Sequence, residues 1–360
     1  MEHKDKRMVS RRQVLRITAV AGVSLAMGTG LVRSLLSRAG LHRVSETRTQ
    51  MGTLVIVTIV APELKVAREM VQNAFGQMER LEGILSRHRR DTPLDRLNTK
   101  GFLETPPTEL VEVMGRALTY SSMTDGAFDM TVAPLLGLYA SRFEEGSRPP
   151  ADHEIKRILE SVDYRRVRVD SDAIALEGPG MKVTLDGIAK GYIVDETANT
   201  LVDDGAERVL INAGGDMASG GDGSLEHPWT VGVRDPAEPH GLLANVRLGG
   251  ECIATSGDYM QAFTQDRRFH HIIDPRTGYS PEQTSAVTVI TTSAMDADAL
   301  STGMMVLGPA EGFRLMKSLD DTEGVIATKE GELMTTPGLD HRKGTDLRAG
   351  LSGLDLAELR

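Results

Sequence analysis

Apolar residues recur along the chain with two different periods, which predict buried strands and amphipathic helices. Residues 52–60 form an unbroken run of aliphatic and β-branched side chains, typical of a buried strand. Apolar residues then return every three or four positions from Val66 to Leu85, which predicts a helix with one buried face. A second amphipathic helix is expected after Pro107, ending at the turn 125–126.

The rest of the chain mixes short strands and helices. The polar, charged stretch 141–150 predicts a loop or lid, and the last strand before the final helix, 286–291, alternates between apolar and polar residues. The other expected strands are 165–169, 173–176, 182–185, 209–212, 229–234 and 251–257, the other helices 151–162, 187–202 and 297–307, and a hairpin is expected at 325–334. Because no regular strand-helix-strand rhythm appears, an α+β fold is favoured over a doubly wound sheet.

Composition and charge narrow the class of protein. The 360 residues are 40% hydrophobic and 26% charged, typical of a globular chain with one large domain or two intertwined ones. The first 50 residues carry a net charge of +7, so the remainder carries −17. A body this acidic disfavours a nucleic-acid partner and is compatible with bound metal cations. Cys252 is the single cysteine, which excludes an internal disulfide and a thiolate metal cluster.

The amino-terminal segment has the features of an export signal. Arg11 and Arg12 precede an uncharged, mostly apolar stretch, residues 17–32, as in a twin-arginine signal. Sixteen residues at a helical rise of about 1.5 Å span about 24 Å, less than the roughly 30 Å hydrocarbon layer. We therefore expect export to the periplasm or the outside of the cell envelope, with an uncleaved signal anchor as the alternative. The expected division is a targeting segment at 1–45, one folded domain at 46–340 and a tail at 341–360.

Asp296, Asp298 and Thr302 form the sharpest chemical cluster. Positions 298 and 302 are four apart, so on a helix their carboxylate and hydroxyl share a face and can meet one cation. Oxygen ligands without a nearby Cys or His favour Mg²⁺ over zinc. The alternative is that these aspartates cap the first turn of the helix.

Three further regions carry candidate chemistry, each with a structural alternative. Within 184–191 a glycine joins a strand to a helix, where free backbone amides and a lysine favour an anion such as a phosphate. Residues 213–216 repeat the pattern or form only a tight turn. His271, near an Asp-Pro turn, is a candidate general base. Phe128 and Asp129 offer an aromatic face beside a carboxylate, or a core residue and a cap.

Taken in order, these segments resemble the ApbE family, the FAD:protein FMN transferases. The resemblance covers nearly all of residues 51–308. It rests on MGT at 51–53, SRHRRDTPLDRLN at 86–98, GAFD at 126–129, DGIAKGY at 186–192, NAGGD at 212–216, TSGD at 255–258, HIIDP at 271–275 and DADALST at 296–302. Each motif is ordinary alone, but eight in sequence are not expected by chance.

The resemblance implies a fold, a reaction and a set of site residues. The fold would be α+β, with T-fold-like mixed sheets, packed helices and an FAD cleft between subregions. The reaction would be Mg²⁺-dependent transfer of FMN from FAD to a threonine of an acceptor protein, forming a phosphoester and releasing AMP. Asp298, Thr302 and the carbonyl of Gly187 would hold the metal, and His271 would deprotonate the threonine. The residues expected to line the flavin nucleotide are Met51, His88, Ala127, Phe128, Asp129, Thr184, Lys190 and Ile273.

One departure and two alternatives remain at this stage. Relatives often carry an aromatic residue where this chain has His88, so the stacking contact with FAD is expected to differ there. An FAD pyrophosphatase, with water in place of the threonine, would use the same residues and release free FMN and AMP. A non-catalytic flavin-binding module would leave the Asp298 and Thr302 pair without a role. The resemblance suggests that the acceptor is a membrane subunit of a respiratory flavoprotein complex facing the exported side.

Overall fold

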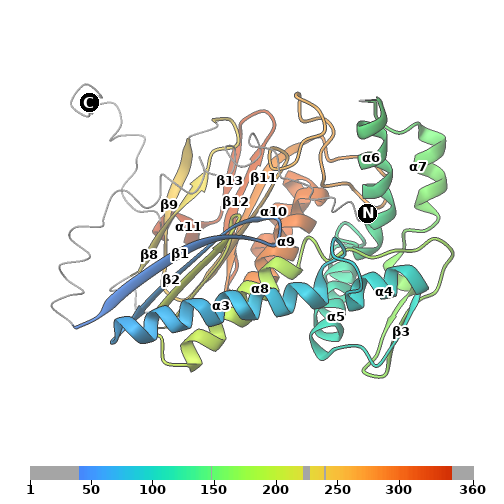
Figure 1. The fold of residues 1–360 in the computed structure, drawn as a ribbon. Coiled ribbons are helices and arrows are strands. Elements are labelled where there is room, and N and C mark those ends of the chain that lie inside the picture. The colour runs from blue at the N-terminus through green and yellow to red at the C-terminus, as the bar shows by residue number, and fades with distance from the viewer. Residues whose placement is uncertain (1–39, 147, 222–227, 239–240, 343–360) are drawn as a thin grey trace.

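A large antiparallel sheet lies at the centre of the computed structural model, which describes residues 40–146, 148–221, 228–238 and 241–342 (Figure 1). In spatial order its eight strands are β1 (His42–Gln50), β2 (Thr53–Ala61), β6 (Arg208–Ala213), β7 (Asp216–Gly221), β10 (Cys252–Gly257), β11 (Thr284–Thr291), β12 (Glu323–Thr328) and β13 (Leu333–Thr335). Two smaller sheets consist of β3 (Phe102–Glu104), β5 (Ala173–Leu176) and β4 (Val167–Val169), and of β8 (Trp229–Arg234) and β9 (Leu242–Leu248). The α+β expectation is confirmed.

Both faces of the large sheet are covered. The helices packed against one face are α3 (Leu64–Leu85), α8 (Ala189–Asp203), α9 (Ala294–Leu307) and α10 (Pro309–Ser318). The β8–β9 hairpin and α11 (Pro337–Arg342) pack against part of the other face. Ile290 of β11 therefore joins the cluster under the hairpin, while its neighbour Val289 joins the main core. The strand expected at 286–291 is present within β11, and all eight residues of β11 are buried because two layers cover this strand.

A second lobe lies at one end of the sheet (Figure 1). It consists of the three-stranded sheet, α4 (Pro93–Lys100), α5 (Thr108–Met123), α6 (Ala133–Gly146), α7 (Asp152–Leu159) and the 3₁₀ turns Met130–Val132 and Tyr164–Arg166. The loop expected at 141–150 is wrong for residues 141–146, which continue α6. Leu135, Tyr139 and Phe143 recur every four residues and pack into one cluster, and this contact extends the helix into a polar stretch.

Residues 182–185 were expected to form a strand, but they are irregular in the structure. The side-chain amide of Asn98 accepts from the Val183 backbone N–H at 2.7 Å and donates to its carbonyl at 2.8 Å. The Thr184 N–H donates to the Met130 carbonyl. These contacts satisfy the backbone groups that a strand would have paired.

Most expected elements are present. The strand expected at 52–60 is β2, the helix expected over 66–85 is α3, and the helix expected after Pro107 is α5. The strand expected at 229–234 is β8, and the hairpin expected at 325–334 consists of β12 and β13. Val66 is exposed although the pattern placed it on the buried face. Strand β1 begins at His42, so residues 42–45 belong to the sheet rather than to the targeting segment. Residues 1–39 and 343–360 lie outside the described residues, and with them the twin-arginine pair and most of the tail. No helix of the described part is long and apolar enough to cross a bilayer.

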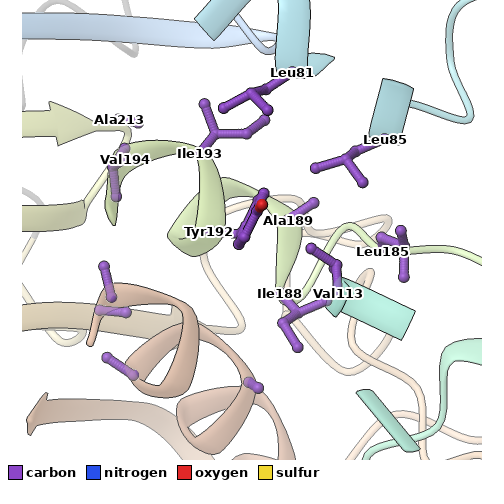
Figure 2. Packing of buried hydrophobic residues seen from close by; sticks show 14 of the residues in the cluster. Leu81, Leu85, Val113, Leu185, Ile188, Ala189, Tyr192, Ile193, Val194 and Ala213 are labelled. Atoms are coloured by element: carbon purple, nitrogen blue, oxygen red, sulfur yellow. The ribbon is translucent and has the colours of Figure 1, made fainter. Parts of the chain in front are cut away.

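The start of α8 is embedded in the core. Ile188, Ala189, Tyr192, Ile193 and Val194 are all buried, and Figure 2 shows several of them facing apolar side chains of α3 and α5. This packing fixes the first turn of α8, and with it the position of every side chain that this turn carries.

Candidate active site

The amino terminus of α9 is capped by residues other than those suspected from the sequence. Ser293 accepts from the Asp296 N–H at 3.2 Å. Asp195 of α8 accepts from the Ala294 and Met295 N–H groups, both at 2.8 Å. The Asp296 carboxylate instead binds the Arg116 guanidinium at 2.7 and 3.0 Å. Asp298 is therefore not needed as a cap, and the capping alternative does not hold for it.

Asp298, Thr302 and Gly187 lie together. Thr302 stands one turn after Asp298 on α9, and a Cβ built on Gly187 would lie 3.2 Å from the Thr302 Oγ1. The turn 186–188 is thus pressed against the hydroxyl at a place where a side chain does not fit. Asp298 is 4% exposed, and its Oδ2 accepts from the Gly191 N–H at 3.2 Å. A carboxylate, a hydroxyl and a backbone carbonyl form an all-oxygen donor set that fits Mg²⁺.

Charged residues from three elements surround Asp298. The Lys190 ammonium forms an ion pair with Asp216, which is 3% exposed. Burial and the Asp216 carboxylate raise the pKa of Asp298, Lys190 opposes both, and the resulting pKa is about 7. Burial alone would lower the pKa of Lys190, but Asp216 and Asp298 hold that pKa above its ordinary value. The site therefore holds more buried negative charge than its one ammonium balances, which favours a bound cation. Among the described residues no group of three or more His, Cys, Asp and Glu is placed to bind a metal.

Replacing Lys190 should destabilise the fold in a pH-dependent way. Lys190→Met leaves Asp216 and Asp298 as buried, unpaired carboxylates, so we expect a loss of about 3 kcal/mol at pH 8 without Mg²⁺. The loss relative to wild type should shrink at pH 5, where the Asp298 carboxylate, whose pKa is raised, takes up a proton. Urea unfolding measures both values. Lys100→Met, at an exposed position on α4, is the control, and equal losses in the two variants would contradict the prediction.

The glycine pair at 214–215 makes a tight turn between β6 and β7. Both glycines have positive φ, +67° and +116°, and a Cβ on Gly214 would lie 2.5 Å from the Thr53 Oγ1. The tight-turn interpretation is therefore correct, and the turn also delivers Asp216 to Lys190. Met51, in the β1–β2 turn, also has positive φ, and its N–H donates to Glu82 at 3.4 Å. Because Thr53 directly follows this turn and lies against Gly214, the Met51 turn lies beside the Gly214 turn.

His271 faces the charged site from an irregular segment. Burial and the Lys190 ammonium lower the pKa of His271, while its backbone contact with Gln261 and the Asp186 carboxylate oppose them. The resulting pKa is about 4. Lys190 and Asp186 are thus within electrostatic range of the imidazole. Its Nδ1 is buried and has no hydrogen-bond partner among the described residues. A neutral imidazole at physiological pH is the form that accepts a proton.

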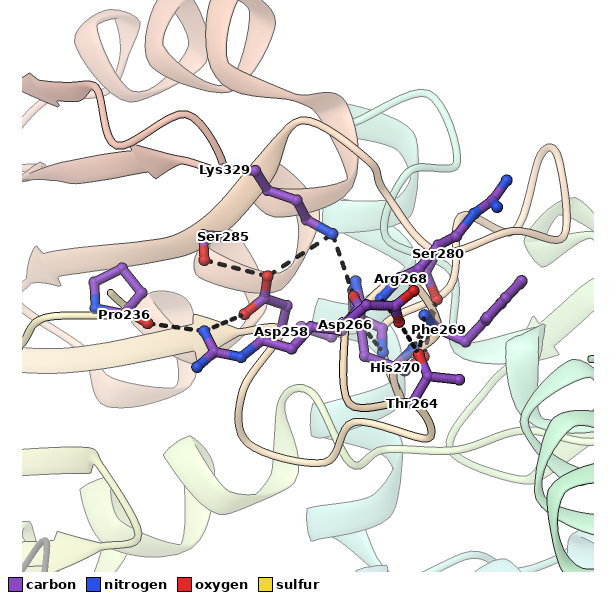
Figure 3. Close-up of polar contacts among 12 residues, drawn as sticks. Pro236, Asp258, Thr264, Asp266, Arg268, Phe269, His270, Ser280, Ser285 and Lys329 are labelled. Carbon is purple, nitrogen blue, oxygen red and sulfur yellow. Dashed lines mark hydrogen bonds and ion pairs between the residues drawn. The ribbon is translucent and has the colours of Figure 1, made fainter. Parts of the chain in front are cut away.

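The neighbouring His270 has a structural role. It is 0% exposed, and its Nδ1 accepts from the Ile272 N–H at 3.3 Å. The Ser280 hydroxyl contacts both its N–H and its carbonyl (Figure 3). Burial lowers the pKa of His270 to about 3, so the folded protein keeps this imidazole neutral where the unfolded chain protonates it.

His270 should make the protein sensitive to acid. Its folded pKa is below the unfolded value of 6.5, so stability is lost as the pH falls below 6.5. Between pH 7 and pH 5 this single group should account for about 2 kcal/mol of lost unfolding free energy. His270→Gln should therefore lose less stability over this range than wild type in urea unfolding. An unchanged difference between pH 7 and pH 5 would show that His270 is charged in the folded state.

Several residues expected to line the flavin have internal contacts. The Asp129 Oδ1 accepts from the Thr131 N–H and hydroxyl at 2.7 and 2.6 Å, and its Oδ2 accepts from the Tyr164 N–H at 3.0 Å. Ala127 and Phe128 belong to the main core, and the Phe128 ring underlies Gly187. Ile273 is buried in the cluster around Tyr139. The core and capping interpretations are therefore correct for Phe128 and Asp129, and their contacts with flavin stay predictions.

Asp186 is a site residue that pattern reasoning did not single out. Its carboxylate accepts from the Arg87 Nε at 2.8 Å and lies 3.2 Å from the His88 Nε2. Burial would raise the pKa of Asp186, but His88 and Arg87 lower it well below its usual range. Thr184, which accepts from the Asp186 N–H, shapes the same turn. The only sequence signal for this cluster was the position of Asp186 directly before Gly187.

Comparison with known proteins identifies the family. A model of the ApbE family matches residues 51–326. The chain belongs to the ApbE family. The FAD:protein FMN transferase of Salmonella typhimurium is 30% identical over 332 residues, covering 88% of this chain and 93% of that relative. The ApbE protein of Thermotoga maritima has a TM-score of 0.76 at 28% identity, over 84% of this chain and 100% of its own. The flavinyl transferase ApbE of Pseudomonas stutzeri has a TM-score of 0.73 at 26% identity, over 85% of this chain and 98% of its own.

The ApbE match includes every segment from which the site is built. Residues 51–326 contain the β1–β2 and β6–β7 turns, the start of α8, the first turn of α9 and the segment around His271. The structure brings together Gly187, Asp298 and Thr302, the proposed metal ligands, and His271 lies within electrostatic range of Lys190.

Proposed function

We propose that this ApbE-family protein transfers the FMN part of FAD to a threonine hydroxyl of an acceptor protein, forming a phosphoester and releasing AMP. The names of its relatives support transfer of FMN from FAD to protein. The observation that carries the proposal is the convergence of Asp298, Thr302 and Gly187, with a neutral His271 within electrostatic range of Lys190 and Asp186. One face thus offers oxygen ligands for a cation, and the other a base.

Mg²⁺ would be held by the Asp298 carboxylate, the Thr302 hydroxyl and the Gly187 carbonyl. When bound, it would stabilise the negative charge that builds on the phosphate oxygens during pyrophosphate cleavage. Lys190 adds a second positive charge at the start of α8, where the helix dipole also favours anions. Thr302 is held in place by the Ser256 hydroxyl, 3.0 Å from its Oγ1.

His271 would take the proton from the acceptor threonine. A threonine hydroxyl is a poor nucleophile at neutral pH, and a positioned base contributes roughly 10²–10⁴-fold. The proposed contacts with the flavin nucleotide are Met51, His88, Ala127, Phe128, Asp129, Thr184, Lys190 and Ile273. Of these, His88 has the most exposed side chain, at 64%, so its ring is accessible to a ligand although it contacts Asp186.

The proposal is tested by incubating the protein with FAD, Mg²⁺ and a candidate acceptor, followed by mass spectrometry of the acceptor's threonines. An FMN adduct on threonine, with one AMP released per adduct, is the expected result. Release of free FMN and AMP from FAD and Mg²⁺ alone would instead indicate a pyrophosphatase. FAD that stays intact with every acceptor would contradict both activities.

We further propose that the protein acts outside the cytoplasm, on a membrane subunit of a respiratory flavoprotein complex. The support is the pair Arg11 and Arg12 before an apolar stretch, a signal used for proteins exported in the folded state. Replacing both arginines by lysine should retain the protein in the cytoplasm. Fractionation with an antibody against the protein checks this, and unchanged export would contradict it.

A further inference from the structure

The segment that carries His271 has little regular structure of its own. Between β10 and β11, residues 259–283 form neither helix nor strand, apart from one bridge between Ala262 and His270. The position of the His271 ring therefore depends on contacts that other elements make with this segment.

The first half of the segment is tied down by charges (Figure 3). Arg267 donates to the Pro236 carbonyl at 2.8 Å and lies 3.5 Å from the Asp258 carboxylate. Lys329 donates to the Arg267 carbonyl at 3.3 Å and lies 3.8 Å from Asp258. These contacts end at residue 267, before His271.

The second half is held by Tyr139, which is 0% exposed in the middle of α6. Its ring packs against Phe263 and Phe269, with centroids 6.0 and 6.2 Å away. Its hydroxyl donates to the Gly278 carbonyl at 2.9 Å. One side chain thus contacts both ends of residues 269–278, the stretch that contains His271 and Ile273.

The hydroxyl contact lies where the segment comes closest to the helices. Gly278 has a φ of +84°, and a Cβ there would lie 2.2 Å from the Ile155 Cγ2 of α7. Without the hydroxyl, the Gly278 carbonyl would lose a buried partner and the segment could shift towards water. The contacts of Arg267 with Pro236, Asp258 and Lys329 in the first half do not involve the Tyr139 hydroxyl, so they stay in place without it.

We propose that Tyr139 is a positioning residue, whose hydroxyl holds residues 269–278 so that the His271 imidazole stays opposite Lys190 and Asp186. The proposal rests on the proposed function, in which His271 accepts the proton of the acceptor hydroxyl. Tyr139 touches neither Lys190 nor the metal ligands in any described contact, so it acts through the segment 269–278 rather than on the metal site.

Tyr139→Phe keeps the ring and removes the hydroxyl. We expect kcat for transfer to fall about tenfold, because small displacements of a catalytic group are costly, with the KM for FAD within twofold of wild type. Tyr192→Phe is the matched control, since it also removes a buried tyrosine hydroxyl bond, to Glu112 at 3.1 Å, on the side of α8 that faces α5. Its kcat should stay within twofold. An unchanged kcat in Tyr139→Phe, or a rise in KM alone, would overturn the proposal.

A double variant and a spectroscopic readout complete the test. In a His271→Ala background, Tyr139→Phe should cause no further loss of kcat, whereas a full second loss would show an independent role. The imidazole NMR signals of His271, assigned by their absence in His271→Ala, should shift in Tyr139→Phe without FAD or acceptor. Unshifted signals would overturn the proposal. If wild type transferred no FMN, the proposed function would fail, and these signals would still decide what Tyr139 does.

Discussion

Asp298→Asn should lower FMN transfer at saturating Mg²⁺ by at least about 100-fold, since a metal ion contributes several kcal/mol to the stabilisation of transition-state charge. The asparagine has nearly the same shape, so packing at the start of α9 should be kept. Transfer is measured as FMN bound to an acceptor threonine over time. A wild-type rate in Asp298→Asn would show that the metal lies elsewhere.

The same substitution should leave stability without Mg²⁺ unchanged or higher. Burial and the nearby Asp216 already raise the pKa of Asp298, so removal of its negative charge relieves a repulsion in the folded state. Mg²⁺ should raise the Tm of wild type by binding the native state and should leave the Tm of the variant unchanged. This readout needs neither FAD nor an acceptor.

Asp296→Asn is the matched control for Asp298→Asn. It is the same substitution two residues earlier on the same helix, but the Asp296 carboxylate binds Arg116 rather than the proposed metal site. We expect transfer within twofold of wild type and the same rise of Tm with Mg²⁺. A loss equal to that of Asp298→Asn would mean that both variants act by disturbing α9.

His271→Ala should slow transfer by roughly 10²–10⁴-fold, the contribution of a positioned general base. FAD binding should stay nearly intact, because Lys190 and the start of α8 remain. Rapid-mixing kinetics with an acceptor, together with FAD titration, separate the two effects. His153→Ala, at an exposed position on α7, is the control. A severe loss of FAD binding in His271→Ala would make His271 a structural residue.

The pH dependence provides a second test of His271. Burial lowers its pKa from 6.5 to about 4, so the basic form prevails as soon as the pH rises above about 4. At saturating Mg²⁺, which would bind the ionised Asp298 carboxylate, the acid limb of kcat/KM should therefore lie near pH 4 rather than near 6.5. An inflection at 6.5 would show an imidazole in contact with water.

Local pattern was sufficient where neighbours in sequence decide the structure. The four-residue spacing of Asp298 and Thr302 places both on one helix face, and the glycine pair at 214–215 specifies a turn with positive φ. The sequence pattern was insufficient where contacts between residues far apart in sequence determine the local structure. Residues 141–146 read as a polar loop, yet Phe143 stacks on Phe263 with centroids 5.1 Å apart and keeps them helical.

The sequence by itself determined the α+β class, most helices and strands, the family resemblance and the residues offered as metal ligands and base. Only the tertiary structure decided which aspartate is available for a cation. Asp195 of α8 accepts hydrogen bonds from the first N–H groups of α9, and Arg116 binds the Asp296 carboxylate. Asp298 therefore remains available beside Lys190 and Gly187. The physical reason is that the availability of a carboxylate depends on which donors reach it. Here the two partners, Asp195 as acceptor and Arg116 as donor, lie about 100 or more residues away in sequence from the residues of α9 that they bind. Local periodicity does not encode contacts over such a separation.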